Sequence, residues 1–264
     1  MVKLAANLSM LFNEVDFLDR FAAAHKAGFD AVEYLFPYAY EKKDLAARLE
    51  DNGLKQVLFN IFPGNWDKGE RGIAALPGRE DEFRKAVDQA LGYAQALKCP
   101  RIHVMSGIVP AGVSMERCEA VEVENLRFAT KAAASAGIML VLEPLNHTDF
   151  PGYFLTSVPQ AKALIEAVGA PNLRVQFDIY HQQMAHGAIA ATLKAHYALV
   201  DHVQIAGSPG RNEPDDTQEI NTKYLFGVLD GLGYAGWVGC EYRPKAGTIP
   251  GLGWTRAWGI SPRG

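Results

Sequence analysis

Long apolar runs and a secretion signal are missing from this chain of 264 residues. No apolar run approaches the roughly 20 residues that a membrane-crossing helix needs. The first segment, MVKLAANLSMLF, is interrupted by Asn7 and Ser9 and does not read as the apolar part of a signal peptide. We therefore expect a soluble, cytoplasmic protein that does not act on a membrane.

Cysteine and basic charge are also scarce. Cys99, Cys118 and Cys240 are far apart and form no C-x-x-C pair, which is typical of reduced thiols and not of a disulfide framework. The formal net charge is -4, and no segment is rich in lysine and arginine as a nucleic-acid-binding face would be. We expect a small-molecule substrate and no nucleic-acid partner. The sequence leaves open whether the chain forms a homo-oligomer.

What the chain does contain is a regular alternation of short apolar runs with longer segments of helical periodicity. The clearest helix is 81–98, where apolar residues recur on one face, and several helices end at a glycine just before the next run. Continuous apolar runs are typical of parallel strands buried on both faces. The expected strands are residues 3–10, 31–36, 54–62, 101–107, 138–145, 173–181, 201–207 and 236–242.

Eight strands that alternate with helices, without a break in composition, predict one α/β domain over residues 1–264. We predict a closed (β/α)8 TIM barrel with a reduced final helix, because little chain remains after the eighth strand. The connection 63–80, PGNWDKGERGIAALPGRE, is too long for a plain loop and should lie over the mouth of the barrel. Its Arg71 is a candidate to bind an anionic substrate.

Oxygen-bearing side chains occur near the ends of the last four expected strands: Glu143, Asp178 with His181 after it, Gln204 and Glu241. Alone, Glu143 and Asp178 each read equally well as a helix cap or a loop residue, and Gln204 and His181 read more readily as structural polar residues. Because active sites of such barrels lie at the carboxyl ends of the strands, their joint occurrence favours one site. Three carboxylates and an amide oxygen suit Mg²⁺ or Mn²⁺ better than Zn²⁺.

Other candidates are weaker. Glu33 in AVEYLF either reaches the rim of the barrel or pairs with a buried cation. Arg211 and Arg243 follow the seventh and eighth strands, and His103 reads as a packed core histidine.

Seven stretches together resemble the hydroxypyruvate isomerase family, within the xylose-isomerase-like barrel superfamily. They include LEPLNHTDFPGYFL, QFDIYHQQ and GWVGCEYRPK, and they cover residues 5–12, 28–38, 69–83, 142–155, 176–183, 202–216 and 236–245. The resemblance therefore extends over nearly the whole chain.

The resemblance implies a (β/α)8 fold and interconversion of hydroxypyruvate with tartronate semialdehyde through an enediolate. It implies an acid/base pair, a divalent metal site and a substrate-binding histidine. Arg71 and Arg211 are further candidates for substrate binding, because the carboxylate of a small oxo-hydroxy acid needs a cation, and Glu33 is a further candidate because it could reach the rim. The implied residues are Glu143 and Glu241 for acid/base chemistry, Glu143, Asp178, Gln204 and Glu241 for the metal, and His181 for the substrate.

Gln204 departs from the wider pattern, because related sugar epimerases have histidine there, and a neutral amide is a weaker ligand. The stretches HVMSGIVPAG and QIAGSPGRNEPDD also resemble 2-oxo-tetronate isomerases of the same family. A ketose 3-epimerase is a more distant alternative. A DNA-repair endonuclease on the same barrel is disfavoured by the negative charge and the scattered histidines, and a non-catalytic barrel by the presence of both glutamates.

Overall fold

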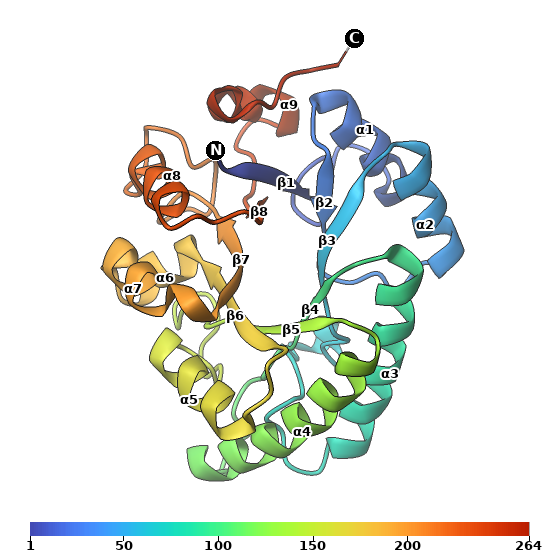
Figure 1. Ribbon diagram of the computed structural model, residues 1–264, viewed down its shortest axis with the longest axis vertical. Helices are drawn as coiled ribbons and strands as arrows, with labels where there is room; N and C mark the ends of the chain where they lie inside the picture. Colours follow the sequence, from blue (N-terminus) through green and yellow to red (C-terminus); the bar gives the residue numbers. More distant parts are fainter. Residues whose placement is uncertain (264) are drawn as a thin grey trace.

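The computed structural model describes residues 1–263. Eight parallel strands form a closed barrel in chain order, with helices around its outside (Figure 1). The prediction of a (β/α)8 barrel is therefore confirmed. The strands are β1 Lys3–Asn7, β2 Ala31–Glu33, β3 Lys55–Asn60, β4 Arg101–His103, β5 Met139–Leu142, β6 Leu173–Asp178, β7 Val200–Ile205 and β8 Trp237–Cys240.

The helices follow the strands as the sequence pattern predicts. The expected helix 81–98 is α3, with acidic residues in its first turn and one continuous buried face. The α-helices are α1 Arg20–Ala27, α2 Lys42–Asp51, α3 Glu80–Leu97, α4 Met115–Ser135, α5 Val158–Val168, α6 Ile179–Ala185, α7 Ile189–His196, α8 Thr222–Gly231 and α9 Thr248–Gly251. Short 3₁₀ segments cover Phe17–Asp19, Trp66–Lys68, Tyr197–Leu199 and Leu252–Trp258.

The chain after β8 is short, as expected. It contains only α9 and the 3₁₀ segment Leu252–Trp258, which lie near the N-terminus and α1 in Figure 1. Gly28, the residue that ends α1, shows how closely this segment packs. It has φ of 108°, and a Cβ there would collide with the backbone of Ser261. The reduced final helix thus closes the ring beside α1.

Side chains fill the interior of the barrel at the amino-terminal ends of the strands. Ala5, Ala31 and Val57 form a small apolar cluster with Trp237 against it. At the same end Arg101 of β4 reaches Asp201 of β7, with 2.7 Å between Nε and Oδ2. Because the amino-terminal end of the barrel is filled and is bridged by this ion pair, a functional site is expected at the carboxyl ends of the strands.

None of the helices within residues 1–263 is both long enough and apolar enough to span a membrane. All three cysteines are buried free thiols, as the sequence predicts.

Candidate active site

The four strand-end residues lie at one end of the barrel. Asp178 is the last residue of β6, and Gln204 is the penultimate residue of β7. These two are register partners, and Gln204 is in turn the partner of Gly239 in β8. Glu143 and Glu241 each follow directly after a strand. All four side chains are buried, so each needs a partner that repays its removal from water.

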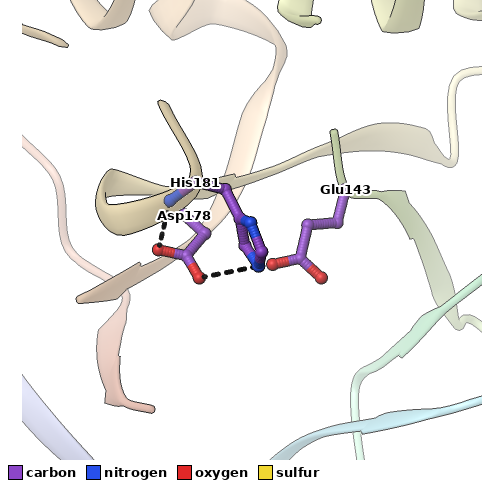
Figure 2. Close-up of side chains that lie close together, drawn as sticks. All are labelled: Glu143, Asp178 and His181. Carbon is purple, nitrogen blue, oxygen red and sulfur yellow. Dashed lines mark hydrogen bonds and ion pairs between the residues drawn. The ribbon is translucent and has the colours of Figure 1, made fainter. Parts of the chain in front are cut away.

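Glu143, Asp178 and His181 come closest to forming a metal-binding cluster. One ligand atom from each lies within 4.8 Å of the other two. Figure 2 shows Glu143 arriving from one ribbon, and Asp178 and His181 from the next, with all three side chains directed to one region. Asp178 is the N-cap of α6 and accepts the backbone N–H of Tyr180 at 2.7 Å. This cap fixes the first turn, which carries His181.

His181 is arranged as a hydrogen-bond donor. Its Nδ1 accepts the backbone N–H of Asn146 at 3.1 Å, so the proton of the neutral ring is on Nε2. Nε2 lies 3.8 Å from Oδ2 of Asp178. Burial, and then the positive charge of Arg211, lower the pKa of His181 well below its usual value. The ring is therefore neutral near pH 7 and offers an N–H to the site.

Arg211 lies between two of the carboxylates. Its Nη2 is 2.6 Å from Oε2 of Glu241 and 3.4 Å from Oδ2 of Asp178. The guanidinium also lies over the ring of Tyr180, 5.0 Å from its centroid. Burial by itself would lower the pKa of Arg211, but the two carboxylates raise it above its usual value. Arg211 is thus a permanently charged group inside the acidic site.

The two glutamates of the expected acid/base pair both have raised pKa values. Burial is the main cause for Glu241, and although Arg211 opposes it, the pKa rises to about 8. Burial also raises the pKa of Glu143, with further contributions from Glu241 and Asp178. A carboxyl group with a raised pKa, such as Glu241 near 8, suits a role in which it both takes and gives protons at neutral pH.

His103, interpreted from the sequence as a core residue, lies beside Glu143. Its Nδ1 is 3.5 Å from Oε2 of that glutamate. Burial, and then His202, lower the pKa of His103 to about 3, so the ring is neutral and does not neutralise the carboxylate. Oε1 of Glu143 has no hydrogen-bond partner within residues 1–263. An orphaned buried oxygen marks a position where a ligand group is missing.

These residues fit a hard divalent cation. Glu143 and Asp178 supply oxygen ligands of the kind that Mg²⁺ and Mn²⁺ prefer. The other two expected ligands are engaged with protein groups. Glu241 is paired with Arg211, and Oε1 of Gln204 accepts a hydrogen bond from Gln176 at 2.6 Å.

The glycine-rich connection after β3 is partly docked on the barrel. Its backbone forms a bridge between Gly72 and Ser106, and Asn125 donates to the carbonyl of Ala74 at 2.8 Å. Arg71 lies just before this docked part. Its guanidinium stacks over Trp66 at 3.9 Å from the ring centroid and donates to the Trp66 carbonyl.

Glu33 lies inside the barrel, and both of its carboxylate oxygens accept hydrogen bonds from protein donors. That Glu33 also contacts the substrate stays a prediction. The sequence reading also missed Gln176, Asn7 and His202, which contribute to the polar interior. The only signal for them was a polar residue inside an otherwise apolar strand.

A comparison with protein-family models matches residues 21–258 to the xylose isomerase-like TIM barrel family. Among curated proteins, the chain is 54% identical to 2-oxo-tetronate isomerase of Cupriavidus necator over 98% of this chain and 99% of that one. It is 47% identical to hydroxypyruvate isomerase of Escherichia coli over 96% and 98%. A crystal structure of an AP endonuclease, family 2, from Brucella melitensis has a TM-score of 0.95 and 47% identity, covering 98% of this chain and 99% of that one. The chain therefore belongs to the xylose isomerase-like TIM barrel family, in the branch that contains hydroxypyruvate isomerases and 2-oxo-tetronate isomerases.

Proposed function

We propose that this enzyme interconverts hydroxypyruvate and tartronate semialdehyde by moving a proton between adjacent carbons. The observation that carries the proposal is the pair of buried glutamates with raised pKa values, Glu143 and Glu241, beside a fixed cation, Arg211. A carbon-bound proton next to a carbonyl is removed by a nearby base, and the enediolate that forms is reprotonated at the neighbouring carbon.

In the proposed reaction one glutamate takes the proton from C3 of hydroxypyruvate, the hydroxyl proton of O3 moves to O2, and the other glutamate returns a proton to C2. The C3 alcohol thereby becomes the aldehyde and the C2 ketone becomes the alcohol. Both residues follow strands that end at the same face of the barrel, which allows them to work on one substrate from different sides. The Nε2–H of His181 donates to a substrate oxygen, and Arg211 binds the substrate carboxylate with a charge-assisted hydrogen bond. A bound Mg²⁺ or Mn²⁺ would neutralise the charge that develops on the enediolate oxygens.

The same chemistry on a substrate one carbon longer makes 2-oxo-tetronate the second candidate. The 54% identity to the Cupriavidus necator enzyme favours it specifically. The purified protein should be assayed with hydroxypyruvate and 2-oxo-tetronate side by side. We expect kcat/KM to be at least about tenfold higher for hydroxypyruvate, which corresponds to about 1.4 kcal/mol of transition-state binding. The opposite order would assign the chain to 2-oxo-tetronate, and turnover of neither would reject the proposed function.

The same experiment includes a DNA duplex with an abasic site, because one structural relative has an endonuclease name. Such a nuclease needs a histidine-rich site with several metals. Within the part of the chain that the structure describes, the one candidate metal cluster contains a single histidine, His181. We expect no cleavage, and cleavage at a rate comparable to isomerisation would move the function to another class.

Arg71 is expected to help bind the substrate carboxylate by a closing movement of the segment around Trp66. Arg71→Ala should raise KM and lower kcat/KM by roughly 10- to 100-fold, the loss expected for about 1.5–3 kcal/mol of charge-assisted bonding. Fluorescence of Trp66 should change when a substrate analogue binds, because the guanidinium lies over its ring.

The matched control for this experiment is Arg84→Ala, which removes an exposed arginine that lies over Phe128 on the outer helices. It should leave both kinetic constants unchanged. Wild-type kinetics in Arg71→Ala would show that the segment only packs on the barrel.

A further inference from the structure

A line of buried polar side chains runs through the interior of the barrel, where apolar packing is the rule. Its members are Asn7 of β1, Glu33 of β2, Gln176 of β6, and His202 and Gln204 of β7, each no more than 1% exposed. Each buried polar group costs free energy unless it is hydrogen-bonded, so the geometry of this line is strongly determined.

Glu33 is the centre of this line. Its Oε1 accepts from Nδ2 of Asn7 at 3.0 Å and from Nε2 of Gln204 at 2.7 Å. Its Oε2 accepts from Nε2 of His202 at 2.7 Å. Three donors from two other strands therefore hold one carboxylate, and this carboxylate accepts all three bonds.

The acceptor at Glu33 decides which way the amide of Gln204 faces. Because the nitrogen end must point at Glu33, the oxygen end points away, and it accepts from Nε2 of Gln176 at 2.6 Å. The line therefore runs from Glu33 through Gln204 to Gln176, which lies two residues before Asp178 in β6.

The space for Glu33 is provided by a missing side chain. Gly239 of β8 has an ordinary backbone conformation, but a Cβ built on it would fall directly on the Glu33 carboxylate. Glycine inside a strand often marks a close approach of this kind. The position of the Glu33 carboxylate is thus determined by its three hydrogen-bond donors and by the backbone of Gly239, which has no side chain to displace it.

We propose that Glu33 is a positioning residue, which turns the nitrogen of the Gln204 amide toward itself, so that the amide oxygen is the atom that a divalent cation would take over from the Gln176 N–H. The inference rests on the proposed function, because it assigns Glu33 to the metal site of the same reaction. Groups that orient metal ligands typically change metal affinity or activity by about 10- to 100-fold when they are removed.

The test uses Mn²⁺ as the probe, with free Mn²⁺ measured by electron paramagnetic resonance, together with kcat and KM. Glu33→Gln replaces an acceptor by a group that must also donate, so one of its three partners loses its bond. We expect Mn²⁺ affinity and kcat each to fall about 10- to 100-fold, with KM within about threefold of wild type. A residue that supported only the fold would lower thermal stability without changing Mn²⁺ affinity.

Two further variants separate position from folding. Gly239→Ala displaces the Glu33 carboxylate without changing any charge, and it should weaken Mn²⁺ binding in the same range. The exchange of Glu33→Gln with Gln204→Glu keeps one carboxylate and one amide in contact, and it should recover at least about tenfold of the lost affinity. Glu122→Gln is the matched control, because Glu122 is also fully buried but bonds to Ser106 instead. It should bind Mn²⁺ within about twofold of wild type.

Mn²⁺ affinities within about twofold of wild type in both Glu33→Gln and Gly239→Ala would overturn the inference. If Glu33→Gln does not fold, Gly239→Ala decides alone. Wild-type protein that binds no Mn²⁺ also overturns the inference, whereas the turnover assays still decide the proposed function. Wild-type protein that binds Mn²⁺ but converts neither acid rejects the proposed function, and the Mn²⁺ comparison still decides the role of Glu33.

Discussion

Glu143→Gln and Glu241→Gln are each expected to lower kcat by at least about 100-fold, the scale typical of a positioned general acid or base. Glutamine keeps the shape of each side chain and removes its ability to take a proton. Both glutamates have pKa values raised mainly by burial, so the charged form is disfavoured at these positions. An uncharged glutamine at position 143 should preserve or raise the melting temperature, and a loss of turnover in that variant then reflects lost chemistry. Glu241→Gln also removes a carboxylate from the buried Arg211 and should lower the melting temperature, so its turnover is measured at a temperature where the variant is folded.

The measurement is turnover under saturating substrate together with a thermal unfolding curve for each variant. Glu122→Gln, which changes a buried glutamate of α4 that accepts a hydrogen bond from Ser106, is the control and should keep wild-type kcat. If either site variant turns over at close to the wild-type rate, the proton-transfer role assigned to that residue is wrong.

The sequence predicts the barrel well because the same pattern, an apolar run followed by a helix, repeats eight times. Each of the eight apolar runs contains one strand of the barrel, and the strand-end positions of Glu143, Asp178 and Glu241 follow from the run that precedes each residue. Strand ends were less accurate. The run 138–145 was expected as one strand, whereas β5 stops at Leu142, because Leu145 is buried by loop packing and not by the sheet.

The contacts within the site could not be predicted in the same way. Arg211 reaches Glu241 and Asp178 from a loop residue with φ of 53°, a conformation that no sequence pattern marked. The sequence also could not predict whether Glu33 points into the barrel or out toward the helices. Both faces of its strand are apolar, so an alternating pattern does not distinguish the inner face from the outer one. Long-range polar contacts depend on register across strands, and register appears only in three dimensions.

For Gln204, the position in the strand could be predicted from the sequence, whereas its contacts could not. Its place near the end of the seventh strand was predictable, and so was an amide oxygen as a hard ligand. Its hydrogen bonds to Glu33 and Gln176 were not, and they change how the residue is understood. The bond to Glu33 orders the amide as a ligand, whereas the bond from Gln176 occupies the oxygen that a cation would need.

The last prediction concerns removal of the metal. Chelation followed by dialysis should lower kcat at least about 100-fold, because a cation that stabilises developing oxygen charge contributes several kcal/mol and each tenfold in rate corresponds to about 1.4 kcal/mol. Mg²⁺ or Mn²⁺ should restore more activity than Zn²⁺, since the expected ligands all bind through oxygen, namely Glu143, Asp178, Gln204 and Glu241.

Gln204→His supplies the decisive comparison for this site. A histidine at this position keeps a ring N–H for the Glu33 carboxylate and presents its second nitrogen where the amide oxygen was. Zn²⁺ and Co²⁺ should then bind more tightly, while affinity for Mg²⁺ falls, because imidazole favours these ions and Mg²⁺ favours oxygen. Unchanged metal preference would remove Gln204 from the ligand set. A protein shown by elemental analysis to be free of metal, yet fully active, would remove the cation from the mechanism and leave Arg211 as the group that balances the enediolate charge.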